Sequence, residues 1–353
     1  MVYAGIDLHP KNMAIVAINN NNEVMREAEM PTSVRSLADF FSTLDQPVQA
    51  VVECTCNWYW LSDWCRENNI PLTLAHAKMV KAISYAKVKT DTVDAKTLAQ
   101  LLRVDLIPEA HQAGPERREL RELTRGRLRM VHDRSRLQSG LWSVAIKYNI
   151  GISGDDWRYL PELQDKLVRQ LPSAASLQAE LLIGQVSQLC RHISRLEAEI
   201  EKQASFSHQA QDLIQVPGIA KVGAWTILAE IGDITRFPSP KQFTSYCRLV
   251  PGSKNSGGKS RHKSGNKDGN KYLRMAFGQA GISAYTHYKP VKKFYNKIKR
   301  RSGKPVARAV VAKELAKIVW HMLTKDQEYK GFKGQPTRVA QQTYWPQPIS
   351  PNA

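Results

Sequence analysis

The order of apolar runs in the first hundred residues constrains the fold of this chain more than any other feature. Three short strand-like runs come first, separated by turn-forming residues, and helix-like and strand-like runs alternate after them. The strand-like runs are residues 2–7, 13–18, 23–30, 48–52 and 71–75, and the helix-like runs are residues 33–44, 58–68 and 92–103. This order predicts a mixed α/β layer fold for the N-terminal part.

The middle of the chain has helical periodicity. A helix is expected from Pro115 to about Tyr148, with proline in its first turn. Apolar residues then recur at spacings of four and three, at Leu182, Val186, Leu189, Ile193, Leu196 and Ile200. This a/d seam predicts a coiled-coil hairpin or a contact between subunits, with packing inside one domain as the alternative. Residues 149–175 contain two glycines and two prolines and are expected to be a connection.

The C-terminal part is predicted to be mostly helical, with helices at 272–284, 290–300 and 306–323. Residues 213–228 resemble a helix-hairpin-helix, whose backbone amides can hold a phosphate; a plain Pro-Gly connector is the alternative. The predicted domains are an α/β domain (1–112), a helical coiled-coil segment (113–208), a C-terminal domain (209–330) and a poorly packed tail (331–353).

The charge of the chain indicates a polyanionic partner. Its formal net charge is +19, and residues 251–304 hold fifteen Lys and Arg against one acid, Asp268. A chain this basic is typical of nucleic-acid-binding proteins, although a merely solubilising basic surface is the alternative. The candidate nucleic-acid-binding residues are Lys221, Lys254, Lys259, Arg261, Lys263, Lys267, Lys271 and Arg274, with Arg125 and Arg129 on the 115–148 helix. Aromatic residues that could stack on bases are Tyr272, Phe277, Tyr285, Tyr288, Phe294 and Tyr295. The Gly/Ser/Lys-rich segment 253–269 is expected to be flexible.

Other classes of protein fit the sequence poorly. No window approaches 18 consecutive apolar residues, so a membrane span is not expected, and the N-terminus does not resemble a secretory signal. Five cysteines are an odd number and argue against a disulfide framework. Cys54, Cys56 and Cys65 lack a fourth ligand at zinc-site spacing. We therefore expect a cytoplasmic, nucleoid-associated protein.

Four acidic residues stand at positions where α/β folds assemble active sites. Asp7 ends the first predicted strand, Glu53 ends the fourth, and Asp91 and Asp94 lie three residues apart at a helix start. Grouped carboxylates repel one another, and a hard divalent cation such as Mg²⁺ relieves that repulsion. Two such ions can support phosphodiester chemistry. Taken singly, Asp91 and Asp94 would be ordinary residues of a helix N-terminus; the set of four favours a metal site.

The set resembles the Asp-Glu-Asp-Asp (DEDD) site of the RNase H-like, RuvC-type nuclease fold. With GIDLH at residues 5–9 and KTDTVDAKTLA at 89–99, the chain resembles the insertion-sequence 110 family of transposases, including the 1111 subgroup and the related Piv-type invertases. The C-terminal motifs VPGIAKVGAWTILAEIGD, RFPSPKQFTSYCRLVPG and NSGGKSRHKSGNKDGNKYLRMAFGQA occur in the order of that family. Cys56 and Arg248 depart from its pattern, because both positions usually carry glycine.

The resemblance implies a second catalytic element, the serine of the SGG motif, which here is Ser256. By itself this serine is better explained as part of a Gly/Ser linker that contacts phosphates, and Ser253 and Ser260 compete with it. The implied mechanism is strand exchange through a 5′-phosphoserine link, supported by two Mg²⁺ ions at Asp7, Glu53, Asp91 and Asp94. A noncoding bridge RNA would guide the protein to donor and target double-stranded DNA, and a homodimer or homotetramer is expected.

Two other functions remain open at this point. A RuvC-like junction resolvase would use the same acids with water as the nucleophile, and Ser256 would be structural. A nucleic-acid-binding protein with an inactive RNase H-like domain would need no catalysis, although the complete set of four acids weighs against it. The serine and the acids are far apart in the sequence, so the first function requires domain packing to bring them together.

Overall fold

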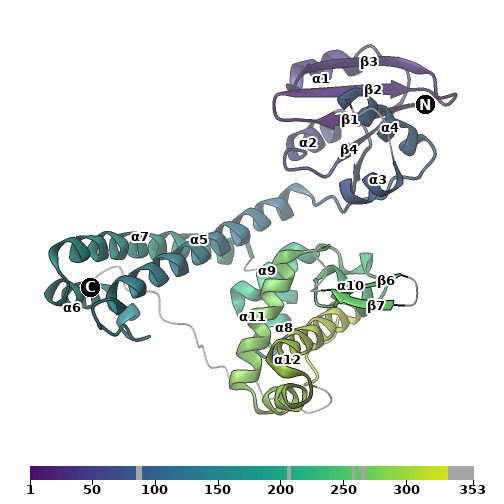
Figure 1. The fold of residues 1–353 in the computed structure, drawn as a ribbon. Helices are drawn as coiled ribbons and strands as arrows, with labels where there is room; N and C mark the ends of the chain where they lie inside the picture. The colour runs from purple at the N-terminus through teal and green to yellow at the C-terminus, as the bar shows by residue number, and fades with distance from the viewer. Residues whose placement is uncertain (85–89, 205–207, 257–258, 264–267, 333–353) are drawn as a thin grey trace. The chain divides into compact units, whose positions relative to one another are not determined.

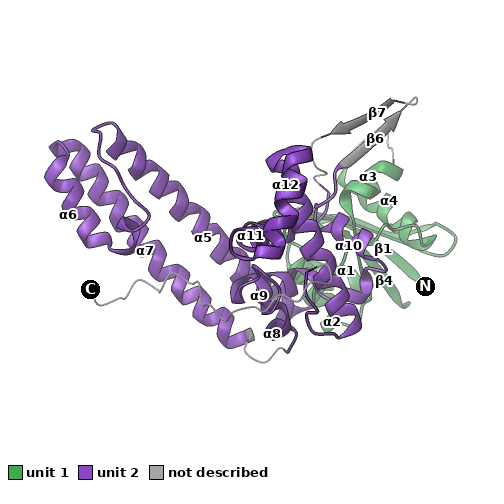
Figure 2. Cartoon of the chain, turned by 90° about the horizontal axis from the view of Figure 1, so that it is seen from below, with its two compact units in different colours: residues 1–113 green, residues 114–353 purple. Residues whose placement is uncertain are grey.

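The computed structural model describes residues 1–84, 90–204, 208–256, 259–263 and 268–332, and only the backbone between 252 and 263. The chain forms two compact units, residues 1–113 and 114–353 (Figure 2). The first unit ends within one residue of the predicted α/β domain. The second contains both the predicted helical segment and the predicted C-terminal domain, whose separation near residue 208 stays a prediction.

The N-terminal unit is a five-stranded mixed sheet with helices on both faces (Figure 1). Its elements are β1 (Val2–Leu8), β2 (Asn12–Ile18), β3 (Val24–Pro31), α1 (Val34–Phe41), β4 (Val48–Glu53), α2 (Tyr59–Glu67), β5 (Leu72–Ala75), α3 (Ala77–Ile83) and α4 (Asp91–Arg103). The strand order is β3-β2-β1-β4-β5. The β1-β4-β5 part is parallel, and β2 and β3 are antiparallel to their neighbours. The predicted mixed α/β fold is confirmed.

The two faces of this sheet carry different helices, because successive residues of a strand point to opposite sides. Even-numbered residues of β1 and β4, such as Ile6 and Val52, pack with Phe40 of α1 and Leu61 of α2. The opposite face packs against α4, whose Ala95 and Ala99 join a second apolar cluster with β2. The odd-numbered positions of β1 and β4 therefore face α4.

A long helical hairpin begins the second unit. It consists of α5 (Pro115–Ile146), the short turn η1 (Asp156–Arg158), α6 (Leu160–Gln170) and α7 (Ser173–Ala204). Helices α5 and α7 pack along one another (Figure 1), and the a/d residues Val186, Ile193 and Ile200 of α7 are buried. The seam is thus used within the chain, as the hairpin interpretation predicts.

The prediction that residues 149–175 are only a connection is wrong. They include α6, whose Leu160, Leu163 and Leu167 are buried at helical spacing against the end of the hairpin. Pro161 is compatible with this helix because it lies in the first turn, where its missing N–H costs nothing.

The rest of the second unit is mostly helical. Its elements are α8 (His208–Ile214), α9 (Lys221–Ile231), η2 (Ile234–Arg236), α10 (Pro240–Tyr246), β6 (Gly252–Ser256), β7 (Lys259–Lys263), α11 (Lys271–His287) and α12 (Lys289–Lys325). Helix α12 is interrupted at Gly303, whose φ of 81° matches the predicted break between two helices. The core of this part is formed mainly by α9, α11 and α12, with Phe243 and Phe277 fully buried in it.

Two paired strands lie within the segment 253–269, whose flexibility stays a prediction. Residues 252–256 and 259–263 form an antiparallel pair of strands, in which Ser256 pairs with Lys259 and Gly252 pairs with Lys263. We name this pair of strands the hairpin β6–β7. The predicted tail beyond Phe332 lies outside the described residues. Within the described part of the chain, no helix is both long enough and apolar enough to cross a membrane.

Candidate active site

The sheet register places Asp7 beside Glu53. Ile6 of β1 pairs with Val52 of β4 in parallel register, so Asp7 and Glu53 are the next residues on adjacent strands. Both lie at odd-numbered positions, which face α4. Glu53 also pairs with Ala75 of β5 at the same end of the sheet. Two of the four predicted acids thus lie side by side at the carboxyl ends of parallel strands.

Helix α4 brings the other two acids to this face. Thr90 caps the helix by accepting a hydrogen bond from the Val93 N–H at 3.2 Å, and Asp91 and Asp94 occupy its first turn. Carboxylates are stabilised there by the positive end of the helix dipole. The two positions are neighbours on the helix surface, since they are three residues apart.

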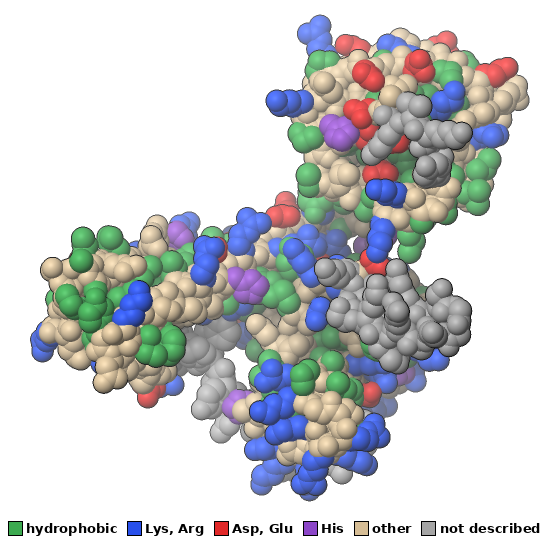
Figure 3. Space-filling view, in the orientation of Figure 1, with side chains coloured by type: hydrophobic (Ala, Val, Ile, Leu, Met, Phe, Trp, Pro, Cys, Tyr) green, Lys and Arg blue, Asp and Glu red, His purple; other side chains and the backbone are tan. Residues whose placement is uncertain are grey.

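Measured distances show how closely part of the site is gathered. The Nε2 atom of His9 lies 3.4 Å from Asp7 Oδ2 and 3.9 Å from Asp91 Oδ1. The three side chains offer ligand atoms that all lie within 4.8 Å of one another. Acidic side chains gather beside a histidine on one face of the N-terminal unit (Figure 3). Sequence reasoning missed His9, although it lies in the GIDLH motif two residues after Asp7.

The electrostatics of Asp7 indicate a site that favours a cation. Burial raises the pKa of the Asp7 carboxyl above its usual range, and the charges of Asp91 and Asp94 raise it further. The adjacent His9 lowers the Asp7 pKa, but does not cancel these effects. Asp7 therefore interacts electrostatically with both acids of α4. Clustered carboxylate oxygens that repel one another are the ligand set that Mg²⁺ fits.

Ser256 lies in the second unit, at the last paired position of β6. Lys254, Lys259, Arg261 and Lys263 belong to the same hairpin. Their side chains, and Lys267 altogether, lie outside the described residues, so their contacts with nucleic acid stay predictions.

The departure at Arg248 has a structural explanation. Its φ is 55°, a left-handed conformation that glycine adopts most easily. Its Nε donates to the Gly269 carbonyl at 2.7 Å, so the side chain that replaces glycine joins the two ends of the segment that contains β6–β7.

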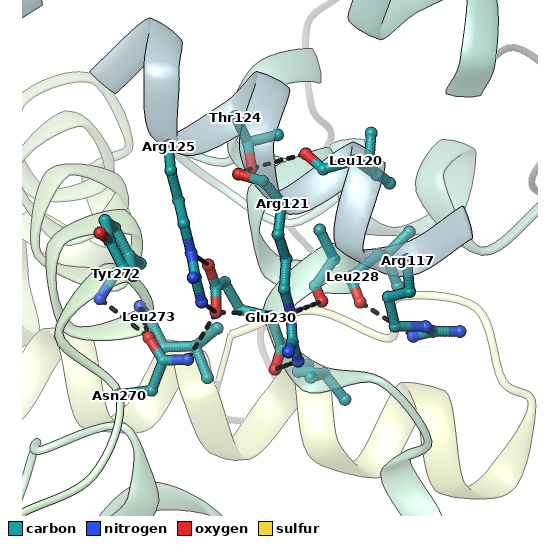
Figure 4. Close-up of polar contacts among 12 residues, drawn as sticks. Arg117, Leu120, Arg121, Thr124, Arg125, Leu228, Glu230, Asn270, Tyr272 and Leu273 are labelled. Atoms are coloured by element: carbon teal, nitrogen blue, oxygen red, sulfur yellow. Dashed lines mark hydrogen bonds and ion pairs between the residues drawn. The ribbon is translucent and has the colours of Figure 1, made fainter. Parts of the chain in front are cut away.

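The remaining candidate nucleic-acid-binding residues differ in their surroundings. Arg129, Lys271 and Arg274 are exposed. Lys221 forms an exposed ion pair with Glu201, with 2.6 Å between Nζ and Oε1. Arg125 has a partner inside the protein, because it forms a two-pronged ion pair with buried Glu230 and is only 27% exposed (Figure 4). Its predicted contact with nucleic acid stays a prediction.

Several of the aromatic residues are not available for base stacking. Phe277 is fully buried and Tyr295 is 7% exposed. Tyr285 stacks on Tyr295 with ring centroids 4.0 Å apart, and Phe294 packs against Phe332. The expectation of base stacking is wrong for Phe277 and Tyr295, because the hydrophobic core buries them, and it stays a prediction for the partly buried Tyr285 and Phe294. By contrast, the lysines and arginines around them are exposed, and Figure 3 shows them crowded over the end of the unit that α11 and α12 form.

Two family models match the chain. One, the DEDD model of IS110 elements, is described as "Transposase" and matches residues 4–147, which include all four acids. The other is described as "Transposase IS116/IS110/IS902 family" and matches residues 210–296, which include Ser256. Between them the two models match most of the chain.

Curated relatives carry the same name. The transposase for insertion sequence element IS1111A of Coxiella burnetii is 24% identical over 269 residues, which are 74% of this chain and 73% of that protein. The transposase for insertion sequence element IS1328 of Yersinia enterocolitica is 28% identical over 141 residues, 39% of this chain and 42% of that protein. Given the acids on the α/β sheet and the order of the two matched regions, the chain belongs to the IS110 family of transposases, and it is a DNA transposase/recombinase.

Proposed function

We propose that this transposase is an RNA-guided DNA recombinase that excises and inserts its own mobile element. In this proposal, Asp7, Glu53, Asp91 and Asp94 form a metal-dependent RNase H-like site, and Ser256 is the nucleophile. The observation that carries the proposal is the grouping of the acids: the register joins Asp7 to Glu53, and the electrostatics of Asp7 join it to both acids of α4.

The four carboxylates are suited to hold divalent cations. Asp7 is largely enclosed, with 17% of its side chain exposed, while Asp91 is 56% exposed. The Asp91 carboxylate is therefore accessible from solvent. Bound Mg²⁺ would neutralise charge on the scissile phosphate and lower the pKa of an attacking hydroxyl.

The proposed covalent step involves Ser256 and one phosphodiester. Its Oγ forms a bond to phosphorus as the bond from phosphorus to the 3′ oxygen breaks, which leaves a 5′-phosphoserine link and a free 3′ hydroxyl. The proton of the serine hydroxyl passes to a carboxylate, and the leaving 3′ oxygen takes up a proton. The lysines and arginines of β6–β7 would offset the charge that develops on the phosphate oxygens. Position supports this role, because Ser256 ends β6 beside the glycines of the SGG motif.

The nature of the basic surface supports guidance by RNA. Exposed Lys and Arg of the second unit can contact phosphates, whereas Phe277 and Tyr295 are buried and cannot stack on bases. Phosphate contacts position a protein on nucleic acid but do not read its sequence. A recombinase with such a surface can leave the reading of donor and target DNA to base pairing with a bridge RNA. Since exchange joins two duplexes, the proposal includes a homodimer or homotetramer.

A RuvC-like junction resolvase is the second candidate. The observation in its favour is that all four acids lie within the N-terminal unit, so the metal site needs no residue from the second unit. In that case water attacks the phosphate and no protein–DNA link forms.

Two variants separate these functions. The substrate is a plasmid with the natural element and its flanking DNA, and the readouts are junction formation and a covalent protein–DNA adduct. Ser256→Ala is expected to abolish both, while Ser253→Ala and Ser260→Ala form the adduct. Asp7→Asn is expected to abolish cleavage, with Asp39→Asn on α1 as the matched control. Cleavage without an adduct by Ser256→Ala would support the resolvase, and cleavage by Asp7→Asn would exclude the metal site.

A further inference from the structure

Arginines of α5 bind the C-terminal end of α9. The last turn of a helix leaves carbonyl oxygens without partners in the helix. Arg117 donates to the Leu228 carbonyl at 3.2 Å, and Arg121 donates to the carbonyls of Ala229 at 2.8 Å and Glu230 at 3.1 Å (Figure 4). The two arginines lie four residues apart, on one side of α5. This side of the helical hairpin is thereby fixed to α9.

The Glu230 side chain lies at the centre of this contact and is fully buried. Its carboxylate accepts hydrogen bonds from Arg125 Nε at 2.6 Å and Arg125 Nη2 at 2.8 Å. The side-chain amide of Asn270 donates to Oε2 of the same carboxylate at 2.7 Å. Arg125 also lies over the ring of Tyr272, with 4.5 Å from Cζ to the ring centroid. Glu230 therefore joins α5 to the beginning of α11.

Asn270 connects this network to β6–β7. Its side-chain oxygen caps α11 by accepting from the N–H groups of Tyr272 and Leu273. Its own N–H donates to the Tyr246 carbonyl at 2.6 Å. Tyr246 ends α10, a few residues before β6 begins, and Asn270 follows the segment in which β7 ends. The chain that enters the hairpin and the chain that leaves it are thus held together at one point.

The glycine before Asn270 allows the two chain segments to approach closely. Gly269 has a φ of 104°, and a Cβ built there would lie 2.3 Å from the Tyr246 carbonyl oxygen. The Arg248 side chain also donates to the Gly269 carbonyl. Backbone and side-chain contacts therefore hold the base of β6–β7 on both sides.

We infer that Glu230, Asn270 and Arg125 are positioning residues for the hairpin that carries Ser256. This inference rests on the proposed role of Ser256. Capping alone does not require the Asn270–Glu230 contact, because serine caps helices equally well. A buried ion pair is also a poor source of stability compared with apolar packing. What the network provides is a fixed direction of β6–β7 relative to α5 and α9.

The variant Asn270→Ser tests this inference, because it keeps an oxygen that caps α11 and removes the donor to Glu230. Hydrogen exchange at the β6 and β7 amides is expected to rise about tenfold, with the protection of α11 and α12 unchanged. Formation of the covalent adduct on the plasmid with the natural element is expected to slow about tenfold or more, while the affinity for that plasmid stays unchanged.

Charge and rescue variants sharpen the test. Glu230→Gln is expected to give the same defects, whereas Glu197→Gln, which breaks the partly exposed ion pair between α7 and Arg127 of α5, leaves the adduct rate unchanged. The double variant Glu230→Gln/Asn270→Asp restores a donor and an acceptor with their roles exchanged, and is expected to recover part of the rate. A merely structural role would not give this recovery.

The outcomes separate this inference from the proposed function. If Ser256→Ala still forms an adduct, the proposed nucleophile is wrong, whatever Asn270→Ser does. If Ser256→Ala is inactive but Asn270→Ser retains the wild-type adduct rate and hairpin protection, the positioning role is wrong. Loss of protection throughout the second unit in Asn270→Ser, with no recovery in the double variant, would also overturn it.

Discussion

At Gly5 the backbone of the sheet closely approaches the backbone of α4. A Cβ built on Gly5 would lie 1.9 Å from the Ala95 carbonyl oxygen and 2.6 Å from the Ala99 backbone nitrogen. Backbone atoms inside a helix cannot give way as the end of a flexible side chain can, so any larger residue at this position moves α4. Helix α4 carries Asp91 and Asp94. The distance of these two acids from Asp7 therefore depends on the absence of a side chain at Gly5.

We therefore expect Gly5→Ala to reduce the free energy of unfolding of the N-terminal unit by about 2–3 kcal/mol. The matched control is Gly140→Ala in α5, where a Cβ meets nothing within 4 Å. This control is expected to be neutral or stabilising by up to about 1 kcal/mol, because alanine favours the helix. Denaturant unfolding of both variants measures the difference, and equal stabilities would contradict the close approach at Gly5.

The second residue-scale prediction concerns Asp7 and pH. A carboxyl whose pKa is higher in the folded state than its usual 3.8 binds its proton more tightly when folded. Its contribution to stability is therefore full below pH 3.8 and is lost as the pH rises through the raised folded value. Asp7→Asn is expected to remove this loss, so that the metal-free variant is at least as stable as the wild type near neutral pH.

With Mg²⁺ present, the wild type is expected to be more stable than Asp7→Asn. At ten times its dissociation constant, a ligand of the folded state stabilises by about 1.4 kcal/mol, and this gain should be absent in Asp7→Asn. Thermal unfolding with Mg²⁺ or with EDTA, at pH 5 and pH 7.5, gives the comparison. A wild-type stability that does not respond to Mg²⁺ would show that these acids do not hold the ion.

The positions of the four acids in the fold could be predicted from the sequence, because each stands at or near the end of a recognisable element. Strand ends and a helix start place Asp7, Glu53 and Asp91 by simple geometry. His9 could not be predicted in the same way, because its position depends on the turn between β1 and β2. The partner of Arg125 was equally hidden, since Glu230 is 105 residues away and the contact exists only after α5 packs against α9.

At the scale of elements, the helices with long periodicity could be predicted, whereas the paired strands β6 and β7 were not. The α7 seam repeats over six apolar residues and was readable. These two strands have no apolar alternation, and composition alone suggested flexibility.

The first half of α12 provides the element-scale prediction. Val291 and Tyr295 are buried, whereas Lys292, Lys293 and Lys297 are exposed. Each lysine that contacts a phosphate of B-form DNA adds about 0.9 to the slope of log affinity against log salt concentration. Replacing the three by alanine is expected to lower that slope by up to about 2.7, measured by fluorescence anisotropy on a labelled duplex.

A control with equal loss of charge is available on the helical hairpin. Lys147, Arg169 and Arg195 are exposed there, away from the α11 and α12 elements. Replacing these three residues by alanine should change the slope by less than about 0.9, the contribution of one phosphate contact. Equal slopes for the two triple variants would show that net charge, and not the α12 surface, sets the affinity.

At the scale of the whole molecule, each unit has its own hydrophobic core. The sheet of the N-terminal unit packs around Ile6 and Phe40, and the second unit packs around Phe277 and Leu315. Residues 1–113 and 114–353 are each long enough to support a stable core. Each core should therefore unfold cooperatively.

We expect thermal unfolding to show two transitions that respond to different substitutions. Gly5→Ala should lower only the midpoint temperature at which the N-terminal unit unfolds. Leu315 of α12 is fully buried, so Leu315→Ala should lower only the midpoint temperature of the second unit. The expected loss in that unit's free energy of unfolding is about 2–5 kcal/mol. Calorimetry gives the two midpoints, and hydrogen exchange assigns each to its unit. A single transition that both variants shift equally would mean that the two units fold as one. In that case the acids and the serine hairpin would already be coupled in the protein without nucleic acid.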